Sequence, residues 1–185
     1  DAQRESEARR LFESSGYSAS EPLQIKLLFD VGDIHERVAL AVSAMWRDVL
    51  GVTVDLDKRE WKYFLDTRHR RSEWQTMRFA WSVDFYHPST FTGTLHSASP
   101  QNLPGYNNPR FDEIIEEAAA ARDSSVQARR FASAETLMLH DYPIAPLYFS
   151  VSKHLVKPSV QGFHDNVLDQ HPTRFLHKTA HIPGN

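Results

Sequence analysis

The chain contains no cysteine and only seven glycines among its 185 residues. Without cysteine it can form no disulfide, no thiolate metal site and no cysteine nucleophile, and this absence fits an oxidising and a reducing compartment equally well. Neither a glycine-rich phosphate loop nor a G-x-S-x-G nucleophile elbow is present. Nucleotide chemistry is therefore not expected, and no nucleophile, base and orienting group stand at the spacing of a known hydrolase.

Neither sign of charge dominates, and long apolar runs are missing. The 21 Lys and Arg nearly balance the 24 Asp and Glu, for a net charge of −3, which argues against a nucleic-acid surface or a polybasic membrane anchor. No window reaches the roughly 18 to 20 apolar residues that cross a bilayer. With 41% hydrophobic residues, the chain is long enough for one substantial core, and we expect one domain.

Hydrophobic periodicity in the first half predicts alternating strands and helices. The expected strands are 23–29, 52–56 and 77–83, and the expected helices are 5–14, 34–49 with Asp33 as N-cap, and 61–71. Strand, helix and strand in succession imply right-handed parallel crossovers. The order indicates an open α/β sheet.

The second half begins with a polar, turn-rich stretch from His87-Pro88 to Pro109, which we expect to be functional surface. Helices are predicted at 111–122 and 125–140, where apolar residues recur in phase. Residues 145–156 are expected to form a late edge strand or hairpin. The tail from residue 161 onward is polar and rich in histidine.

The ten histidines stand mostly alone in expected loops, so no metal site is predicted. His35-Glu36 begins like a zinc-protease helix motif, but Ala39 occupies the position of the second ligand. That site is rejected.

Asp84 is the most informative carboxylate. In the predicted strand 77–83, Arg78, Ser82 and Asp84 share the face opposite the apolar side chains. A carboxylate at the C-terminal end of such a strand lies where open α/β sheets bind ligands. The alternative is a turn-forming or capping Asp before Pro88.

Several segments in order resemble the extracellular solute-binding proteins of ABC importers, in the family that includes oligopeptide, dipeptide and nickel binders. The segments are residues 1–17, ending in Gly16-Tyr17; residues 81–88, similar to W-x-x-D-Y-x-x-P with Phe85 in place of Tyr; residues 105–112, similar to Y-x-N-P-x-F-D; and Ala134-Glu135 with residues 143–148. The resemblance covers about residues 1–165.

This resemblance implies an α/β fold, with residues 1–165 as part of the C-terminal ligand-binding lobe of a type II periplasmic binding protein. The lobe would hold an open mixed sheet flanked by helices, followed by a polar tail at 166–185, and the first lobe and signal peptide are expected to be absent. The family implies a periplasmic or membrane-anchored extracellular receptor that is no enzyme and needs no cofactor. We expect a monomer that binds short peptides, passes them to ABC permeases in the membrane and binds no nucleic acid.

The resemblance also implies site residues. The Asp of the 81–88 segment, here Asp84, pairs with the α-ammonium of a peptide ligand in the family's peptide binders. Trp81 and Phe85 are candidate cleft walls, with Tyr86 beside them, although strand parity also permits core packing of Trp81. Arg78 is a candidate for a ligand carboxylate or for a structural ion pair. His87 departs from the family pattern, so a nickel, metal-chelate or other small-solute receptor on the same fold stays open.

Overall fold

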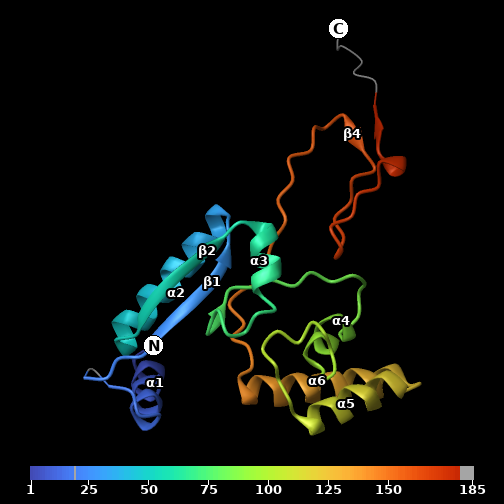
Figure 1. Ribbon diagram of the computed structural model, residues 1–185. Helices are drawn as coiled ribbons and strands as arrows, with labels where there is room; N and C mark the ends of the chain where they lie inside the picture. The colour runs from blue at the N-terminus through green and yellow to red at the C-terminus, as the bar shows by residue number, and fades with distance from the viewer. Residues whose placement is uncertain (19, 180–185) are drawn as a thin grey trace. The chain divides into compact units, whose positions relative to one another are not determined.

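The computed structural model describes residues 1–18 and 20–179. The chain divides into two compact units, Asp1–Ala80 and Trp81–Asn185. We call them unit 1 and unit 2 and describe each by itself (Figure 1). Both contain helices and strands, so the α/β fold class is confirmed. The boundary predicted after residue 165 stays a prediction.

Unit 1 follows the predicted β-α-β-α-β order. Its elements are α1 (Ala2–Ser14), β1 (Gln24–Asp30), α2 (Asp33–Leu50), β2 (Thr53–Arg59), α3 (Trp61–Thr67) and β3 (Thr76–Met77). The strands form a parallel sheet in the order β2-β1-β3. The first crossover runs from β1 through α2 to β2, and the second runs from β2 through α3 to β3 on the other side of β1, as the alternation of elements predicts.

The sequence of β1 explains why both of its faces are covered. Leu27 and Phe29 point to one face, where they pack with Ala39 of α2. Leu28 points to the other face and packs with Phe64 of α3. A continuous apolar run is typical of a parallel strand buried on both sides.

The ends of α2 are set by two glycines. Gly32 is the N-cap, and Asp33, predicted to be the cap, is instead the first helical residue. Its carboxylate, together with that of Glu36, lies in the first turn, where the helix dipole favours negative charge. Gly51 ends the helix at φ 70°, a left-handed conformation that favours glycine.

The third strand is shorter than predicted. Only Thr76–Met77 is a strand, extended by one hydrogen bond of 2.9 Å from the Arg78 amide to the Leu28 carbonyl. In this register Leu28 lies opposite Met77, so a strand reaching residue 83 would need partners within α2. The predicted strand 77–83 is therefore wrong, and with it the face shared by Arg78 and Asp84.

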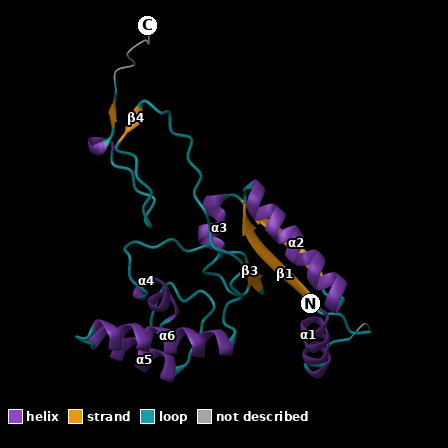
Figure 2. Ribbon diagram, turned by 180° about the vertical axis from the view of Figure 1, so that it is seen from behind, coloured by secondary structure: helices purple, strands orange, loops and turns teal. Residues whose placement is uncertain are grey.

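The regular secondary structure of unit 2 is mainly helical among the described residues. Its elements are α4 (Ser89–Thr92), η1 (Gly93–Leu95), α5 (Pro109–Ala120), α6 (Ser124–Asp141), β4 (Val160–Gln161), η2 (Thr173–Phe175) and β5 (His177–Lys178). The helices predicted at 111–122 and 125–140 are confirmed, and they lie side by side (Figure 2). The strands β4 and β5 pair antiparallel, so parallel and antiparallel pairing occur in two separate sheets instead of one mixed sheet.

The core of unit 2 lies between α5 and α6 and contains the residues whose periodicity predicted these helices. They are Phe111, Ile114, Ile115 and Ala118 from α5, and Phe131, Ala134 and Met138 from α6, with Leu95 beside them. The predicted strand at 145–156 is wrong, because this segment is irregular and exposed and pairs with no strand among the described residues. A strand needs a neighbour to satisfy its backbone, and local sequence does not supply one.

Asn108 joins the start of α5 to the end of α6. Its side-chain oxygen accepts hydrogen bonds from the amides of Arg110 and Phe111, and its Nδ2 donates to Asp141 Oδ2 at 2.6 Å. The Tyr106 hydroxyl donates to the same oxygen at 2.6 Å. Burial and this hydrogen bond raise the pKa of Tyr106 to about 12, while the bonds from Tyr106 and Asn108 lower the pKa of Asp141.

We expect Asn108→Ala to lower the free energy of unfolding of unit 2 by about 1 to 2 kcal/mol, because a helix N-cap is lost. Urea titration followed by circular dichroism measures the change. The control is Asn107→Ala, since Asn107 is the exposed neighbour outside the cap. Equal urea midpoints for the two variants would show that Asn108 does not stabilise the helix pair.

Candidate functional site

Four of the five predicted site residues lie in one irregular loop of unit 2. We call residues 81–86 the 81–86 loop. Asp84, Phe85 and Tyr86 are exposed, and Trp81 is half-buried. The loop therefore presents a carboxylate next to two exposed aromatic rings.

His87 anchors the end of this loop to α6. Its Nε2 lies 3.0 Å from Gln127 Oε1, and its Nδ1 lies 2.8 Å from Ser89 Oγ. Gln127 Nε2 donates to the Ala118 carbonyl at 3.1 Å, which leaves Oε1 to accept from His87. A neutral imidazole with its proton on Nε2 can donate to Gln127 Oε1 and accept from the Ser89 hydroxyl at Nδ1.

The ring of His87 is also held by aromatic contacts. It meets Phe131 edge-on at 5.2 Å between ring centroids and stacks with Phe85 at 6.3 Å. The departure from the family pattern at His87 thus has a structural role in this chain. Sequence reasoning missed Gln127, because its bond to His87 spans 40 residues.

Arg78, the fifth predicted residue, belongs to unit 1. Its Nη1 lies 3.5 Å from Oδ1 of Asp30, the last residue of β1, and its side chain is only 12% exposed. His35 Nδ1 lies 2.8 Å from the same oxygen. Arg78 therefore forms the ion pair that was the alternative to ligand binding. Asp30 was missed, although it ends an apolar strand as Asp84 was expected to do.

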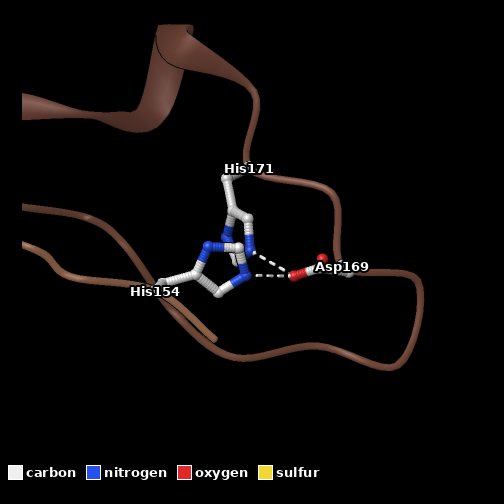
Figure 3. Close-up of side chains that lie close together, drawn as sticks. All are labelled: His154, Asp169 and His171. Atoms are coloured by element: carbon white, nitrogen blue, oxygen red, sulfur yellow. Dashed lines mark hydrogen bonds and ion pairs between the residues drawn. The ribbon is translucent and has the colours of Figure 1, made fainter. Parts of the chain in front are cut away.

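A second group of polar side chains gathers in the C-terminal part of unit 2 (Figure 3). His154 Nε2 and His171 Nε2 lie 2.7 Å and 3.0 Å from Asp169 Oδ1. Hydrogen bonds from Ser152, His171 and His154 hold the pKa of Asp169 well below its usual range. These three side chains are the group of potential metal ligands among the described residues.

Comparison with known proteins establishes the family. A family model described as bacterial extracellular solute-binding proteins, family 5 Middle, matches residues 2–102, more than half of the chain. The chain belongs to family 5 of the bacterial extracellular solute-binding proteins. The resemblance predicted from the sequence segments is thus confirmed.

The relatives of this chain include proteins named as peptide-binding. The periplasmic oligopeptide-binding protein OppA of Salmonella typhimurium is 37% identical over 160 residues, which are 86% of this chain and 29% of OppA. The periplasmic murein peptide-binding protein MppA of Escherichia coli is 34% identical over 159 residues, 85% of this chain and 29% of MppA.

Solved structures agree with this assignment. Haemophilus influenzae OppA in complex with RPPGFSPFR has a TM-score of 0.87 and 33% identity, over 96% of this chain and 35% of OppA. The Escherichia coli murein tripeptide-binding protein MppA has a TM-score of 0.90 and 30% identity, over 97% of this chain and 35% of MppA. The chain spans about a third of the length of these family 5 relatives.

Within residues 1–18 and 20–179, no helix is both long and apolar enough to cross a membrane.

Proposed function

We propose that this chain is part of the substrate-binding component of an ABC importer and binds short peptides in a cleft between two lobes. The observation that carries the proposal is the likeness, at 33% identity, to Haemophilus influenzae OppA solved in complex with a peptide. The named relatives are periplasmic peptide-binding proteins. The receptor would deliver peptides to membrane permeases from the periplasm or from a membrane-anchored extracellular position. It would perform no covalent chemistry and act as a monomer without a cofactor or nucleic acid.

In this proposal residues 1–165 belong to the C-terminal ligand-binding lobe, followed by the tail at 166–185. Cleft closure is a hinge motion, driven by a ligand that contacts both lobes.

Asp84 is the proposed anchor for the α-ammonium of the peptide. Its exposed carboxylate is free to accept charge-assisted hydrogen bonds, which are about twice as strong as neutral ones. Phe85 and Tyr86 are exposed beside it, and exposed apolar groups near a charged anchor are typical of ligand surfaces. Trp81, half-buried in the same loop, is the third proposed wall.

Arg78 is proposed to receive a ligand carboxylate. A guanidinium carries five N–H donors in a planar fork, so the pairing of Nη1 with Asp30 leaves donors for a second partner. The structural ion pair and ligand binding are then compatible roles.

The ligand class is tested by native mass spectrometry of the protein isolated, without refolding, from the cells that make it. A ladder of heterogeneous short peptides released on denaturation would support the proposal. A single small molecule, or a metal or metal chelate released with no peptides, would contradict peptide binding and favour the alternative receptor.

The role of Asp84 is tested by Asp84→Asn in that same protein, with trialanine as the probe. We expect the dissociation constant to rise about tenfold to a hundredfold, because a hydrogen bond to a charged group contributes about 1.5 to 3 kcal/mol. Isothermal titration calorimetry measures it. Glu135→Gln is the matched control, since Glu135 is an exposed carboxylate on α6.

A second probe, N-acetyl-trialanine, lacks the α-ammonium and so tests whether Asp84 contacts that group. Acetylation should weaken binding to the unsubstituted protein strongly and to the Asp84→Asn variant much less. If acetylation costs both proteins the same, Asp84 does not contact the ammonium.

A further inference from the structure

The C-terminal part of unit 2 contains a cluster of side chains that are not among the proposed peptide-binding residues. Three donor groups converge there: both Nε2 atoms contact one carboxylate oxygen of Asp169, and the potential ligand atoms all lie within 4.8 Å of one another (Figure 3). The three residues stand 15 and 2 positions apart in sequence, so folding brings them together.

We propose that His154, Asp169 and His171 form a binding site for a divalent transition-metal ion, with Zn²⁺ as the representative ion. This proposal goes beyond the proposed function, and it stands whether the transported solute is a peptide or not. The sequence predicted no metal site because the histidines stand mostly alone along the chain, and their spacing in the folded structure could not be taken into account.

The spacing of the donor atoms suits zinc. Zinc binds imidazole nitrogen at about 2.0 to 2.1 Å and carboxylate oxygen at about 2.0 to 2.2 Å, so tetrahedral ligands lie roughly 3.4 Å apart. The two nitrogen–oxygen distances, 2.7 and 3.0 Å, need to lengthen by about 0.4 to 0.7 Å. Small side-chain rotations are enough for that change.

The two imidazole rings are held in place by Phe163. His171 stacks on the Phe163 ring with centroids 3.8 Å apart and planes 14° apart, and His154 meets the same ring edge-on at 5.1 Å. Only glycine fits next to Phe163 at position 162, because a Cβ there would clash with the Phe175 carbonyl oxygen. The rings are thus oriented before a metal arrives, which lowers the ordering cost of binding.

Asp169 is positioned by its own turn. It adopts a positive φ of 52°, and its amide donates to the Asn166 carbonyl at 3.0 Å. The Asn166 side chain brackets the turn, accepting from the Gln170 amide at 3.1 Å and donating to the Gln170 carbonyl at 2.9 Å. The carboxylate is therefore directed at both histidines by backbone geometry.

The donor set selects the class of ion. Two imidazoles and one carboxylate suit zinc, nickel and copper, whereas calcium and magnesium prefer sites made of oxygen ligands. The side chains of His154 and Asp169 are 36% and 42% exposed and that of His171 is 12% exposed, so an ion can enter and water can complete its coordination.

A metal would also supply stability where the apolar core does not. Among the described residues, every buried hydrophobic side chain precedes residue 139. Residues 145–179 are held by a two-residue strand pair and by the contacts around Phe163. In such a segment, metal binding and folding reinforce each other.

The test is isothermal titration of ZnCl₂ into the metal-free full chain, with bound zinc counted by elemental analysis after dialysis. We expect one zinc per chain, and His154→Ala or His171→Ala should weaken binding at least about tenfold, since even outer ligand-shell changes cost that much. His164→Ala is the matched control, because His164 is an exposed histidine of the same segment outside the cluster. It should bind zinc like the unsubstituted chain.

Asp169→Asn guards against a folding artefact, because asparagine keeps the size and one acceptor of the carboxylate. It should also bind zinc more weakly, while its circular dichroism in EDTA matches that of the unsubstituted chain. Calcium should not compete with zinc. Unchanged zinc affinity in both histidine variants, or an equal loss in His164→Ala, would overturn the proposal.

Discussion

Replacing Asp30 with alanine is expected to lower the free energy of unfolding of unit 1 by about 3 kcal/mol, because removing one partner of a buried ion pair leaves an uncompensated charge. The Asp30 residue is only 5% exposed. Its Oδ1 lies 2.8 Å from His35 Nδ1 and 3.5 Å from Arg78 Nη1. The variant leaves the Arg78 guanidinium in a largely buried position without its carboxylate.

Urea titration followed by tryptophan fluorescence measures this loss, since Trp74 is buried in the core of unit 1. The matched control is Asp55→Ala, because Asp55 is an exposed carboxylate on the neighbouring strand β2. We expect that control to change stability by less than about 0.5 kcal/mol. If the two variants unfold alike, the pairing of Asp30 with Arg78 does not stabilise unit 1.

The elements that the sequence predicted correctly are those determined by local periodicity. Helices α2, α5 and α6 and strands β1 and β2 all carry apolar residues in phase, and each was found within a few residues of its predicted bounds. The capping residue of α2 was placed one position late, because Gly32 and Asp33 both suit the start of a helix.

The two strand predictions that were wrong, at 77–83 and 145–156, failed for reasons that lie outside the local sequence. Residues 77–83 alternate as a strand should, but β1 ends at Asp30 and α2 begins at Asp33, so no strand lies beyond to pair with them. Residues 145–156 are apolar enough for a strand and pair with none among the described residues. Pairing partners lie far away in sequence, and periodicity carries no information about them.

In the candidate site, too, the contiguous residues could be predicted from the sequence and the contacts between distant residues could not. The 81–86 loop was predicted because its residues are contiguous and match a family segment. The anchoring of His87 by Gln127 and the pairing of Asp30 with Arg78 join residues 40 and 48 positions apart. The convergence of His154 and His171 on Asp169 likewise depends on how residues 154–171 fold back. None of these contacts has a fixed sequence spacing.

The packing between α5 and α6 supports the 81–86 loop of the proposed site. Phe111→Ala is expected to destabilise unit 2 by about 3 to 5 kcal/mol, because truncating a buried phenylalanine removes apolar contacts and leaves a cavity. Phe111 is 0% exposed in the core between α5 and α6, and it meets Tyr106 edge-on at 5.1 Å. Such a loss is a large fraction of the stability of a typical domain.

Phe149→Ala is the matched control, since the same chemical change falls on a ring that is 97% exposed. We expect it to change stability by no more than about 0.5 kcal/mol. Circular dichroism during urea unfolding follows the helices of the chain, which include α5 and α6 of unit 2. Similar losses in both variants would mean that Phe111 is not a core residue. A large loss for Phe111 alone shows that the helix pair, to which His87 fastens the 81–86 loop through Gln127, is held together by this core.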